Sequence, residues 1–239
     1  MKTQPKIIAH RGYSLAFQEN TIESFLGAIN SGADAIETDL HITKDKVIVL
    51  KHDYTLLNGK LLKEVSYEEL IKIEPYIPRL EELIEIVKGK DIELLLEIKE
   101  RDVIPVLIPF LRKINFSNII IGSFDWITLQ EIKHYPDSQK YPTSLMLGSV
   151  MEWEDIVSLA QKYECSFVHP CWEARSSRPH ELLDAKIIEQ LSTELGISTI
   201  LWHEERPEFL KPLLQLPVYG VCTNDPPLAL KLRTECPTI

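Results

Sequence analysis

Long apolar runs are absent from this sequence. No stretch approaches the run of about 18 apolar residues that a helix needs to cross a membrane. The opening segment "MKTQPK" leads directly into a predicted strand and lacks the apolar core of a secretion signal. We therefore expect a protein of the cytoplasm without stable membrane insertion.

Cysteine is scarce, and its four positions lack the paired spacing of a zinc site or of a disulfide framework. A chain without such a framework fits a reducing compartment. We interpret these residues as small core or surface side chains: Cys165, Cys171, Cys222 and Cys236.

Positive charge is also in short supply, because 26 lysine and arginine residues face 36 aspartate and glutamate residues, a net charge of −10. A nucleic acid needs a basic face, so it is excluded as a partner, and an anionic membrane surface would be repelled. A small anionic substrate would need cations supplied by particular side chains.

No linker rich in proline, glycine or serine divides the chain, so we expect one domain over residues 1–239. The sequence indicates no oligomeric state.

Short apolar runs alternate with helix-like stretches along the chain. Nine runs have the pattern of buried strands. They cover residues 7–10, 35–40, 47–51, 93–98, 119–123, 144–147, 167–169, 198–202 and 218–222. Alternation of this kind is typical of a parallel sheet wrapped by helices.

The first helix has the clearest pattern, because the apolar residues of 22–29 share one face and Gly32 follows as a stop. Asn20 and Glu23 are predicted to cap its start. Further helices are predicted over residues 101–113, 126–134, 153–163, 184–195 and 208–215.

One connection is too short for a helix. The segment "ITKDK" reads as a tight turn, so residues 35–43 and 47–52 are predicted to form a hairpin. Counting this hairpin as one element leaves eight, and the sequence therefore predicts an α/β protein with a single (β/α)8 TIM barrel. The stretch 53–78, which contains the helical "SYEELIKI", is predicted as a rim insertion.

The predicted strand ends are unusually polar, and in such barrels the active site lies at the carboxyl ends of the strands. The first strand ends in His10-Arg11, and the hairpin returns at His52-Asp53. Two further strands carry pairs of charged residues two positions apart, which places each pair on one face: Glu37 with Asp39, and Glu97 with Lys99. A salt bridge between Glu37 and Lys99, or between Asp39 and Arg11, would explain any one pair. It does not explain so many charged groups on one rim.

These residue types suit the cleavage of a phosphoester. Glu37, Asp39 and Glu97 offer hard oxygen ligands for Mg²⁺ or Ca²⁺. Arg11 and Lys99 supply the cations that a phosphate needs. His10 and His52 can share general acid and general base duties, because histidine titrates near neutral pH.

Several short motifs occur in the order seen in glycerophosphodiester phosphodiesterases, a family that this chain resembles over nearly its whole length. They are "HRG" at 10–12, "ENT" at 19–21, "IETD" at 36–39, "KHD" at 51–53, "EIK" at 97–99, "SF" at 123–124 and "GVCTNDP" at 220–226. The resemblance implies a TIM barrel that releases glycerol 3-phosphate and an alcohol from a glycerophosphodiester.

The resemblance also implies roles for individual residues. His10 and His52 correspond to the catalytic pair, and the metal ligands would be Glu37, Asp39 and Glu97. Arg11 and Lys99 correspond to phosphate contacts. Asn20, Phe124 and Trp202 are further candidates for substrate binding, although a helix cap, barrel packing and a core tryptophan are their respective alternatives.

The chain departs from the family pattern at a few positions. Gln18 stands where family members usually have proline. A late segment similar to "WTVN" is here Trp202-His203-Glu204-Glu205, and Asn224 replaces an aspartate that is common in the family. Among the remaining histidines, His169 and His203 stand at strand ends.

Two alternative functions remain open. One is a barrel relative resembling lysophospholipase D or sphingomyelinase D, which an apolar rim would favour. The other is a phosphate-binding protein without turnover, which would require the loss of a histidine or a metal ligand. For hydrolysis itself, two histidines from separate strands favour a cyclic phosphate intermediate, and direct attack by a metal-activated water is the alternative.

Overall fold

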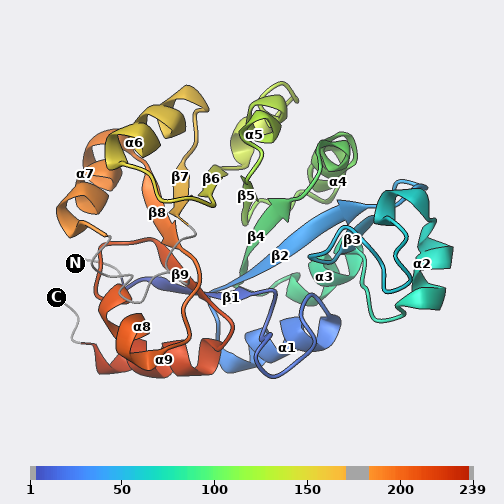
Figure 1. Cartoon of the computed structure of the whole chain (residues 1–239), viewed down its shortest axis with the longest axis horizontal. Coiled ribbons are helices and arrows are strands. Elements are labelled where there is room, and N and C mark those ends of the chain that lie inside the picture. Colours follow the sequence, from blue (N-terminus) through green and yellow to red (C-terminus); the bar gives the residue numbers. More distant parts are fainter. Residues whose placement is uncertain (1–3, 171–182, 237–239) are drawn as a thin grey trace.

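A computed structural model describes residues 4–170 and 183–236, and within these residues nine strands form one sheet that closes on itself (Figure 1). Eight of the strands are parallel, in the order β1-β9-β8-β7-β6-β5-β4-β2, and pairing of β1 with β2 completes the barrel. The strands are β1 (Lys6–His10), β2 (Ala35–Ile42), β3 (Ile48–Leu50), β4 (Glu93–Ile98), β5 (Ile119–Ser123), β6 (Thr143–Leu147), β7 (Phe167–Pro170), β8 (Ser198–Leu201) and β9 (Gly220–Thr223). The predicted TIM barrel is confirmed.

The predicted hairpin is present. Strand β3 runs antiparallel to β2, with Ile42 opposite Ile48 and Leu40 opposite Leu50. Lys46 adopts a left-handed backbone conformation with φ of 66°, which reverses the chain within the short turn. This antiparallel strand lies outside the closed ring and carries the chain to His52.

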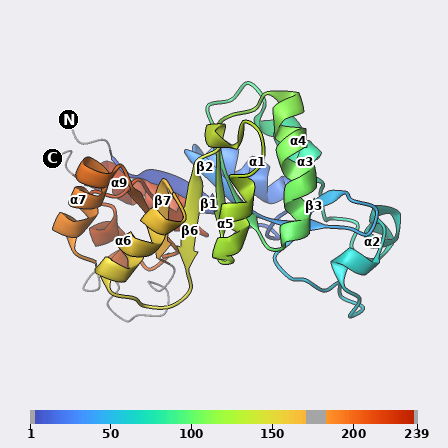
Figure 2. The same ribbon diagram turned by 90° about the horizontal axis from the view of Figure 1, so that it is seen from above.

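The helices surround the barrel (Figures 1 and 2). They are α1 (Ile22–Ser31), α2 (Tyr67–Ile73), α3 (Leu80–Val87), α4 (Ile104–Ile114), α5 (Trp126–Ile132), α6 (Trp153–Lys162), α7 (Ala185–Leu195), α8 (Pro207–Leu213) and α9 (Pro226–Glu235). Within the described residues, three short 3-10 helices cover Leu62–Glu64, Arg101–Val103 and Ser138–Lys140. The sequence analysis assigned no helix to α3 or α9. Helix α9 begins with two prolines, which fit the first turn of a helix but weaken its apolar periodicity.

The start of α1 differs from the prediction. Thr21, not Asn20, caps the helix, because its hydroxyl accepts the N–H of Ser24 and the Ser24 hydroxyl accepts the N–H of Thr21. Asn20 lies one position earlier with φ of 55°, a left-handed conformation that asparagine tolerates. Its side chain is therefore free to point away from the helix and toward the barrel.

The predicted rim insertion, residues 53–78, contains α2, and α2 stands at one end of the molecule, remote from α6 and α7 (Figure 2). It has a small apolar cluster of its own, which includes Leu56, Leu62 and Leu70. At its centre the buried Glu74 carboxylate accepts the Lys51 ammonium at 2.9 Å and the Leu57 N–H at 2.7 Å. A buried carboxylate with several donors orders this segment next to His52.

The barrel interior changes from apolar to polar along most of the strands. A lower layer is apolar and contains Ile8, Ala35, Leu95, Ile120, Phe167, Ile200 and Cys222. Because side chains on one face of a strand recur every two residues, the next inward positions include His10, Glu37, Glu97, His169, Trp202 and Asn224. The apolar layer thus closes the barrel below, and the polar residues stand at its carboxyl end.

The structure also bears on the cysteines and on the absence of long apolar runs. Cys165, Cys222 and Cys236 are buried, and Cys171 lies outside the described residues. Among the helices that the structure describes, none is both long and apolar enough to span a membrane.

Candidate active site

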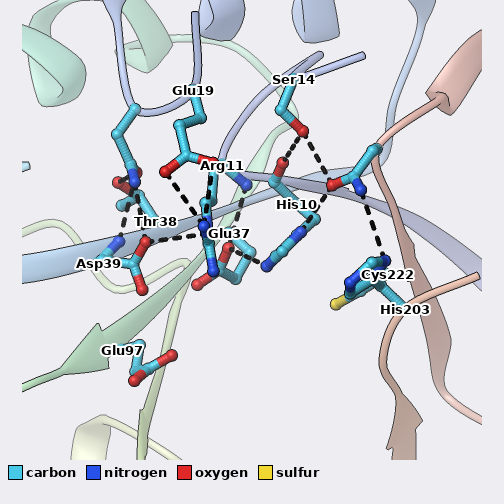
Figure 3. A network of polar contacts seen from close by, with 12 residues as sticks. His10, Arg11, Ser14, Glu19, Glu37, Thr38, Asp39, Glu97, His203 and Cys222 are labelled. Atoms are coloured by element: carbon cyan, nitrogen blue, oxygen red, sulfur yellow. Dashed lines mark hydrogen bonds and ion pairs between the residues drawn. The ribbon is translucent and has the colours of Figure 1, made fainter. Parts of the chain in front are cut away.

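Three carboxylates meet at the carboxyl end of the barrel. Glu37 and Asp39 come from β2, and Glu97 comes from β4, where it lies directly opposite Asp39 in the strand register. Their ligand oxygens all lie within 4.8 Å of one another, and all three side chains are buried (Figure 3). The pairing of β2 with β4 therefore brings the three predicted metal ligands together.

Two of these carboxyls resist ionisation without a cation. Burial, and then repulsion from Asp39 and Glu97, raise the pKa of Glu37 well above its usual value. Burial also dominates at Glu97, where it outweighs the attraction of Lys99 and, together with repulsion from Asp39, raises the pKa to about 7. A divalent cation would relieve both effects, so the donor set fits Mg²⁺ or Ca²⁺ in chemistry and burial.

The third carboxylate is held ionised. Burial alone would raise the pKa of Asp39, but Lys99 and Arg11 outweigh it and hold the pKa below its ordinary value. The Lys99 ammonium lies 2.8 Å from Asp39 Oδ1 and 2.5 Å from Glu97 Oε1, and Arg11 Nε lies 3.3 Å from Asp39 Oδ2. The salt bridge between Asp39 and Arg11 that the sequence left open is thus present, and the ion pairs of Lys99 go to Asp39 and Glu97.

The "HRG" segment is strained at its end. Arg11 has φ of 56°, and its N–H donates to Glu37 Oε2 at 3.0 Å while its guanidinium also contacts the Glu19 carboxylate at 2.9 Å. Gly12 follows with φ of 80°, and a Cβ there would lie 2.6 Å from the backbone of Ser24. Glycine is required at this position, because any side chain would displace α1 from β1.

His10 presents one ring nitrogen to the carboxylates. Its Nδ1 lies 2.7 Å from Asn224 Oδ1, and its Nε2 has no hydrogen-bond partner among the described residues, although Glu37 Oε2 is 3.9 Å away. Burial, followed by the charges of Arg11 and His203, lowers the pKa of His10 well below its usual value. A neutral imidazole with an open nitrogen can accept a proton at neutral pH.

His52 stands at the mouth of the site, with 39 % of its side chain exposed. Its Nδ1 lies 2.9 Å from Asp53 Oδ1, and its backbone carbonyl lies 3.3 Å from Nε2 of the buried His41. His41 in turn contacts the Glu100 carboxylate through Nδ1 at 3.1 Å. The contact with His41 thus connects the loop that carries His52 to β2.

A cavity of about 720 Å³ extends from His52 on the rim to Glu97 of the carboxylate cluster. It is lined by His52, Asp53, Tyr54, Thr55, Glu97, Ile98, Lys99, Ser123, Phe124, Asp125 and Trp202. The rings of Phe124 and Trp202 lie 5.6 Å apart, and Trp202 also packs edge-on against His10 at 5.2 Å. Both aromatic candidates therefore face the cavity, where Phe124 is partly exposed.

Asn20 differs from the expectation of a helix cap. Its Nδ2 donates to Asp39 Oδ2 at 2.8 Å, and its Oδ1 accepts from Thr38 Oγ1 at 2.6 Å. Both ends of the buried amide thus have protein partners, which makes Asn20 a neighbour of the Asp39 carboxylate.

Sequence reasoning gave no role to several residues that the structure brings to the site, which are Ser14, Glu19, His41, Glu205 and Asn224. Glu19 lies within the motif "ENT", and Asn224 lies two positions beyond a buried strand residue, so strand periodicity could have indicated it. Glu205 and Ser14 lie in loops, where no periodic signal exists.

Carboxylates and histidines at the carboxyl end of a barrel are typical of a hydrolase. Comparison with known proteins identifies the family. Residues 10–228 match the model of the glycerophosphoryl diester phosphodiesterase family. A glycerophosphodiester phosphodiesterase of Caldanaerobacter subterraneus is 29% identical over 250 residues, which cover 95% of this chain and 96% of that protein. The chain therefore belongs to the glycerophosphoryl diester phosphodiesterase family, and it is a phosphoric diester hydrolase.

Solved structures agree on the fold. The glycerophosphodiester phosphodiesterase of Thermotoga maritima superposes with a TM-score of 0.80 at 25% identity, covering 98% of this chain and all of that one. A phosphodiesterase of Oleispira antarctica, solved in complex with the product sn-glycerol-3-phosphate, has a TM-score of 0.78 at 20% identity and covers 96% of each chain.

Proposed function

We propose that this enzyme hydrolyses glycerophosphodiesters to glycerol 3-phosphate and an alcohol with the help of Mg²⁺ or Ca²⁺. The observation that carries the metal requirement is the buried cluster of Glu37, Asp39 and Glu97, two of whose carboxyls have raised pKa values. Three buried acids whose oxygens lie within 4.8 Å of one another are unfavourable unless cations offset their charge, and Lys99 and Arg11 leave the pKa values of Glu37 and Glu97 raised. A bound divalent cation would neutralise the phosphate charge that develops during cleavage.

The cationic side chains would receive the phosphate. Lys99 lines the cavity, and its ammonium is held at the carboxylate cluster, so a phosphate bound over the cluster lies within its reach. Arg11 points into the same cluster from β1. We propose that both side chains keep one partner carboxylate and turn a free N–H toward the substrate, which supplies local positive charge in an acidic protein.

The two histidines would move the protons. The open Nε2 of His10 and its lowered pKa support a first role as base. It would take the proton of the glycerol hydroxyl next to the phosphoester, and the hydroxyl oxygen would bond to phosphorus as the bond to the departing alcohol breaks. His52 would give its proton to that alcohol. Water then opens the cyclic phosphate with the two roles exchanged.

Phe124 and Trp202 would bound the pocket for the glycerol or head group. Both rings line the cavity, and a flat apolar wall beside a polyol leaves the hydroxyl groups directed at the polar residues. For Asn20 we propose that it orients Asp39 without contact to the substrate, because its amide already has partners at both ends. The cytoplasmic location stays a prediction from the sequence.

The experiment that tests this function is a substrate panel. Glycerophosphocholine, glycerophosphoethanolamine, glycerophosphoglycerol and a simple phosphodiester without glycerol are each assayed for product phosphate esters, with EDTA and with added Mg²⁺ or Ca²⁺. We expect glycerol 3-phosphate from the first three with metal only. Equal activity in EDTA after dialysis, or equal cleavage of the diester without glycerol, would contradict the proposal.

A lysophospholipid is the second candidate substrate, and one observation favours it. Large apolar side chains are exposed in the segments that follow β1, β3 and β6, among them Leu15, Tyr54, Leu57 and Val150, and Tyr54 also lines the cavity. A rim of this kind suits an acyl chain or a lipid surface. Assaying lysophosphatidylcholine beside glycerophosphocholine decides between the two, because a glycerophosphodiester enzyme prefers the deacylated compound.

A phosphate-binding protein without turnover receives no support from the site. It would require the loss of a histidine or of a carboxylate, and both histidines and all three carboxylates stand at the carboxyl end of the barrel.

A further inference from the structure

The segment after β8 departs from the family pattern at His203 and Glu205, and these two residues lie against His10. The ring of His203 is stacked on the ring of His10, with centroids 4.7 Å apart and planes inclined by 17°. On another side of His10 the Trp202 ring packs edge-on at 5.2 Å. The imidazole of His10 is therefore enclosed by two rings from one segment.

Glu205 fastens this segment to the neighbouring strand. Its Oε1 accepts the backbone N–H of Asn224 at 2.9 Å and lies 2.9 Å from Nδ1 of His203. Burial raises the pKa of Glu205, but the contacts with His203 and with the Asn224 backbone outweigh it and lower the pKa below its ordinary value. The charged carboxylate thus holds a ring and a backbone group at once.

Asn224 completes the circle of contacts. Its Oδ1 lies 2.7 Å from His10 Nδ1 and 2.8 Å from the Ser14 hydroxyl. An amide oxygen only accepts hydrogen bonds, so the proton of a neutral His10 must sit on Nδ1. The lone pair is then on Nε2, which faces the carboxylates without a partner among the described residues.

His10, Asn224 and the segment 202–205 come from adjacent strand ends. Strands β1, β9 and β8 are neighbours in the barrel, and they deliver His10, Asn224 and the segment 202–205 to one place. The contacts therefore run from His10 to Asn224, on to Glu205 and His203, and back to His10 by stacking. Such a closed arrangement restricts both the rotation of the imidazole and the nitrogen that carries its proton.

We infer that Asn224, Glu205 and His203 form a positioning unit that fixes the orientation and the Nδ1–H tautomer of His10. This inference rests on the proposed role of His10 and adds three positioning residues to it. Their effect is on the proton transfer and not on substrate affinity, because none of them is needed to hold the phosphate. Partners that orient a working histidine are typically worth about 10- to 100-fold in activity.

The tautomer is measured directly on the metal-loaded enzyme. With ¹⁵N-labelled histidine, long-range proton-nitrogen NMR distinguishes a protonated Nδ1 from a protonated Nε2, and loss of one signal set in His10→Gln assigns His10. We expect Nδ1–H in the unaltered protein and a mixture of tautomers in Asn224→Leu. A His10 that carries its proton on Nε2 in the unaltered protein would overturn the inference, because the Asn224 amide would then be reversed.

Kinetics test the positioning role. We expect Asn224→Leu and Glu205→Leu to lower kcat by about 10- to 100-fold with KM within about threefold of normal. Asn224→Asp keeps an acceptor oxygen and should restore most of kcat. His203→Phe keeps the stacked ring and should retain more activity than His203→Ala. Glu208→Gln, at an exposed position nearby, is the matched control.

The outcomes separate this inference from the proposed function. If His10→Ala is inactive while Asn224→Leu and His203→Ala turn over normally, the positioning unit is wrong and the role of His10 stands. If His10→Ala is itself fully active, the role of His10 fails and the unit has nothing to position. A variant that does not fold leaves the tautomer of the unaltered protein as the deciding measurement.

Discussion

The side-chain amide of Asn20 donates to Asp39 Oδ2 at 2.8 Å, although the two residues belong to different elements of the barrel. Asn20 reaches Asp39 because its backbone is left-handed and Thr21 takes over the helix cap. Thr38 Oγ1 donates to the other end of the amide and fixes its orientation. A residue that resembles a cap in sequence thus orients a carboxylate of the proposed metal site.

From this contact we predict that Asn20→Ala weakens divalent metal binding. Asp39 would lose a buried donor and a fixed orientation, and outer partners of metal ligands are worth about tenfold or more in affinity. Isothermal titration of Mg²⁺ or Ca²⁺ into the metal-free protein measures the change. Asn30→Ala, at an exposed position of α1, is the control and should bind normally. Equal affinity in both variants would remove Asn20 from the metal site.

Metal should stabilise the protein more strongly at alkaline than at acid pH. Glu97 keeps its proton up to about pH 7 in the folded state and only to its ordinary pKa of 4.5 in the unfolded chain, and the pKa of Glu37 is also raised. The folded state without metal therefore loses stability as pH rises through this window. A cation replaces the missing protons, so the rise in Tm on adding metal should be larger at about pH 8 than at about pH 5.

The matched variant for this experiment is the double substitution Glu37→Gln with Glu97→Gln. It removes both carboxyls whose pKa is raised, so its Tm without metal should vary less with pH in the same window. Thermal unfolding followed by circular dichroism gives the Tm of each protein with EDTA and with metal, at both pH values. An equal effect of metal at both pH values would argue against a cation at these carboxylates.

Removal of either histidine should affect turnover. We predict that His10→Ala and His52→Ala each lower kcat by about 10² or more, the scale for losing a positioned proton-transfer group. Both variants should fold, which a thermal scan verifies. His134→Ala, on an exposed position outside the site, is the control. A raised KM with unchanged kcat would instead mark that histidine as a binding residue.

Lys99 should contribute to stability as well as to catalysis. Lys99→Met removes the ammonium that Asp39 and Glu97 share, and breaking a buried ion pair costs about 3 kcal/mol of unfolding free energy. We expect a lowered Tm without metal, partly restored by saturating Mg²⁺, together with a raised KM. Lys90→Met, at an exposed position, should leave both values unchanged. A lowered Tm with an unchanged KM would show that Lys99 supports the fold alone.

The chemical route can be tested with a substrate that lacks the glycerol 2-hydroxyl. The cyclic route requires that hydroxyl as the nucleophile, so the analogue should be cleaved slowly, and phosphorus NMR should show a cyclic glycerol phosphate from the normal substrate. Efficient hydrolysis of the analogue without any cyclic species would favour direct attack by water.

The sequence determined the barrel and indicated most groups of the candidate site. Short apolar runs and the short turn before β3 were enough to predict eight parallel strands and a hairpin, because burial on both faces leaves a continuous apolar signal. The spacing of two residues along a strand predicted that Glu37 and Asp39 share one face, as do Glu97 and Lys99. Helix α9 was missed because its two initial prolines and weak apolar stripe hide the helical period.

Only the tertiary structure decided which groups touch. The roles of Asn20 and Asn224 depend on contacts between strand ends that are far apart in the chain, and a local pattern carries no information about such pairs. The partners of Lys99 followed from the register between β2 and β4, which sets Asp39 opposite Glu97. The sequence by itself thus determined which chemical groups gather at the barrel mouth, and the closure of the barrel decided their pairing, since pairing depends on distances that arise only when the strands are aligned.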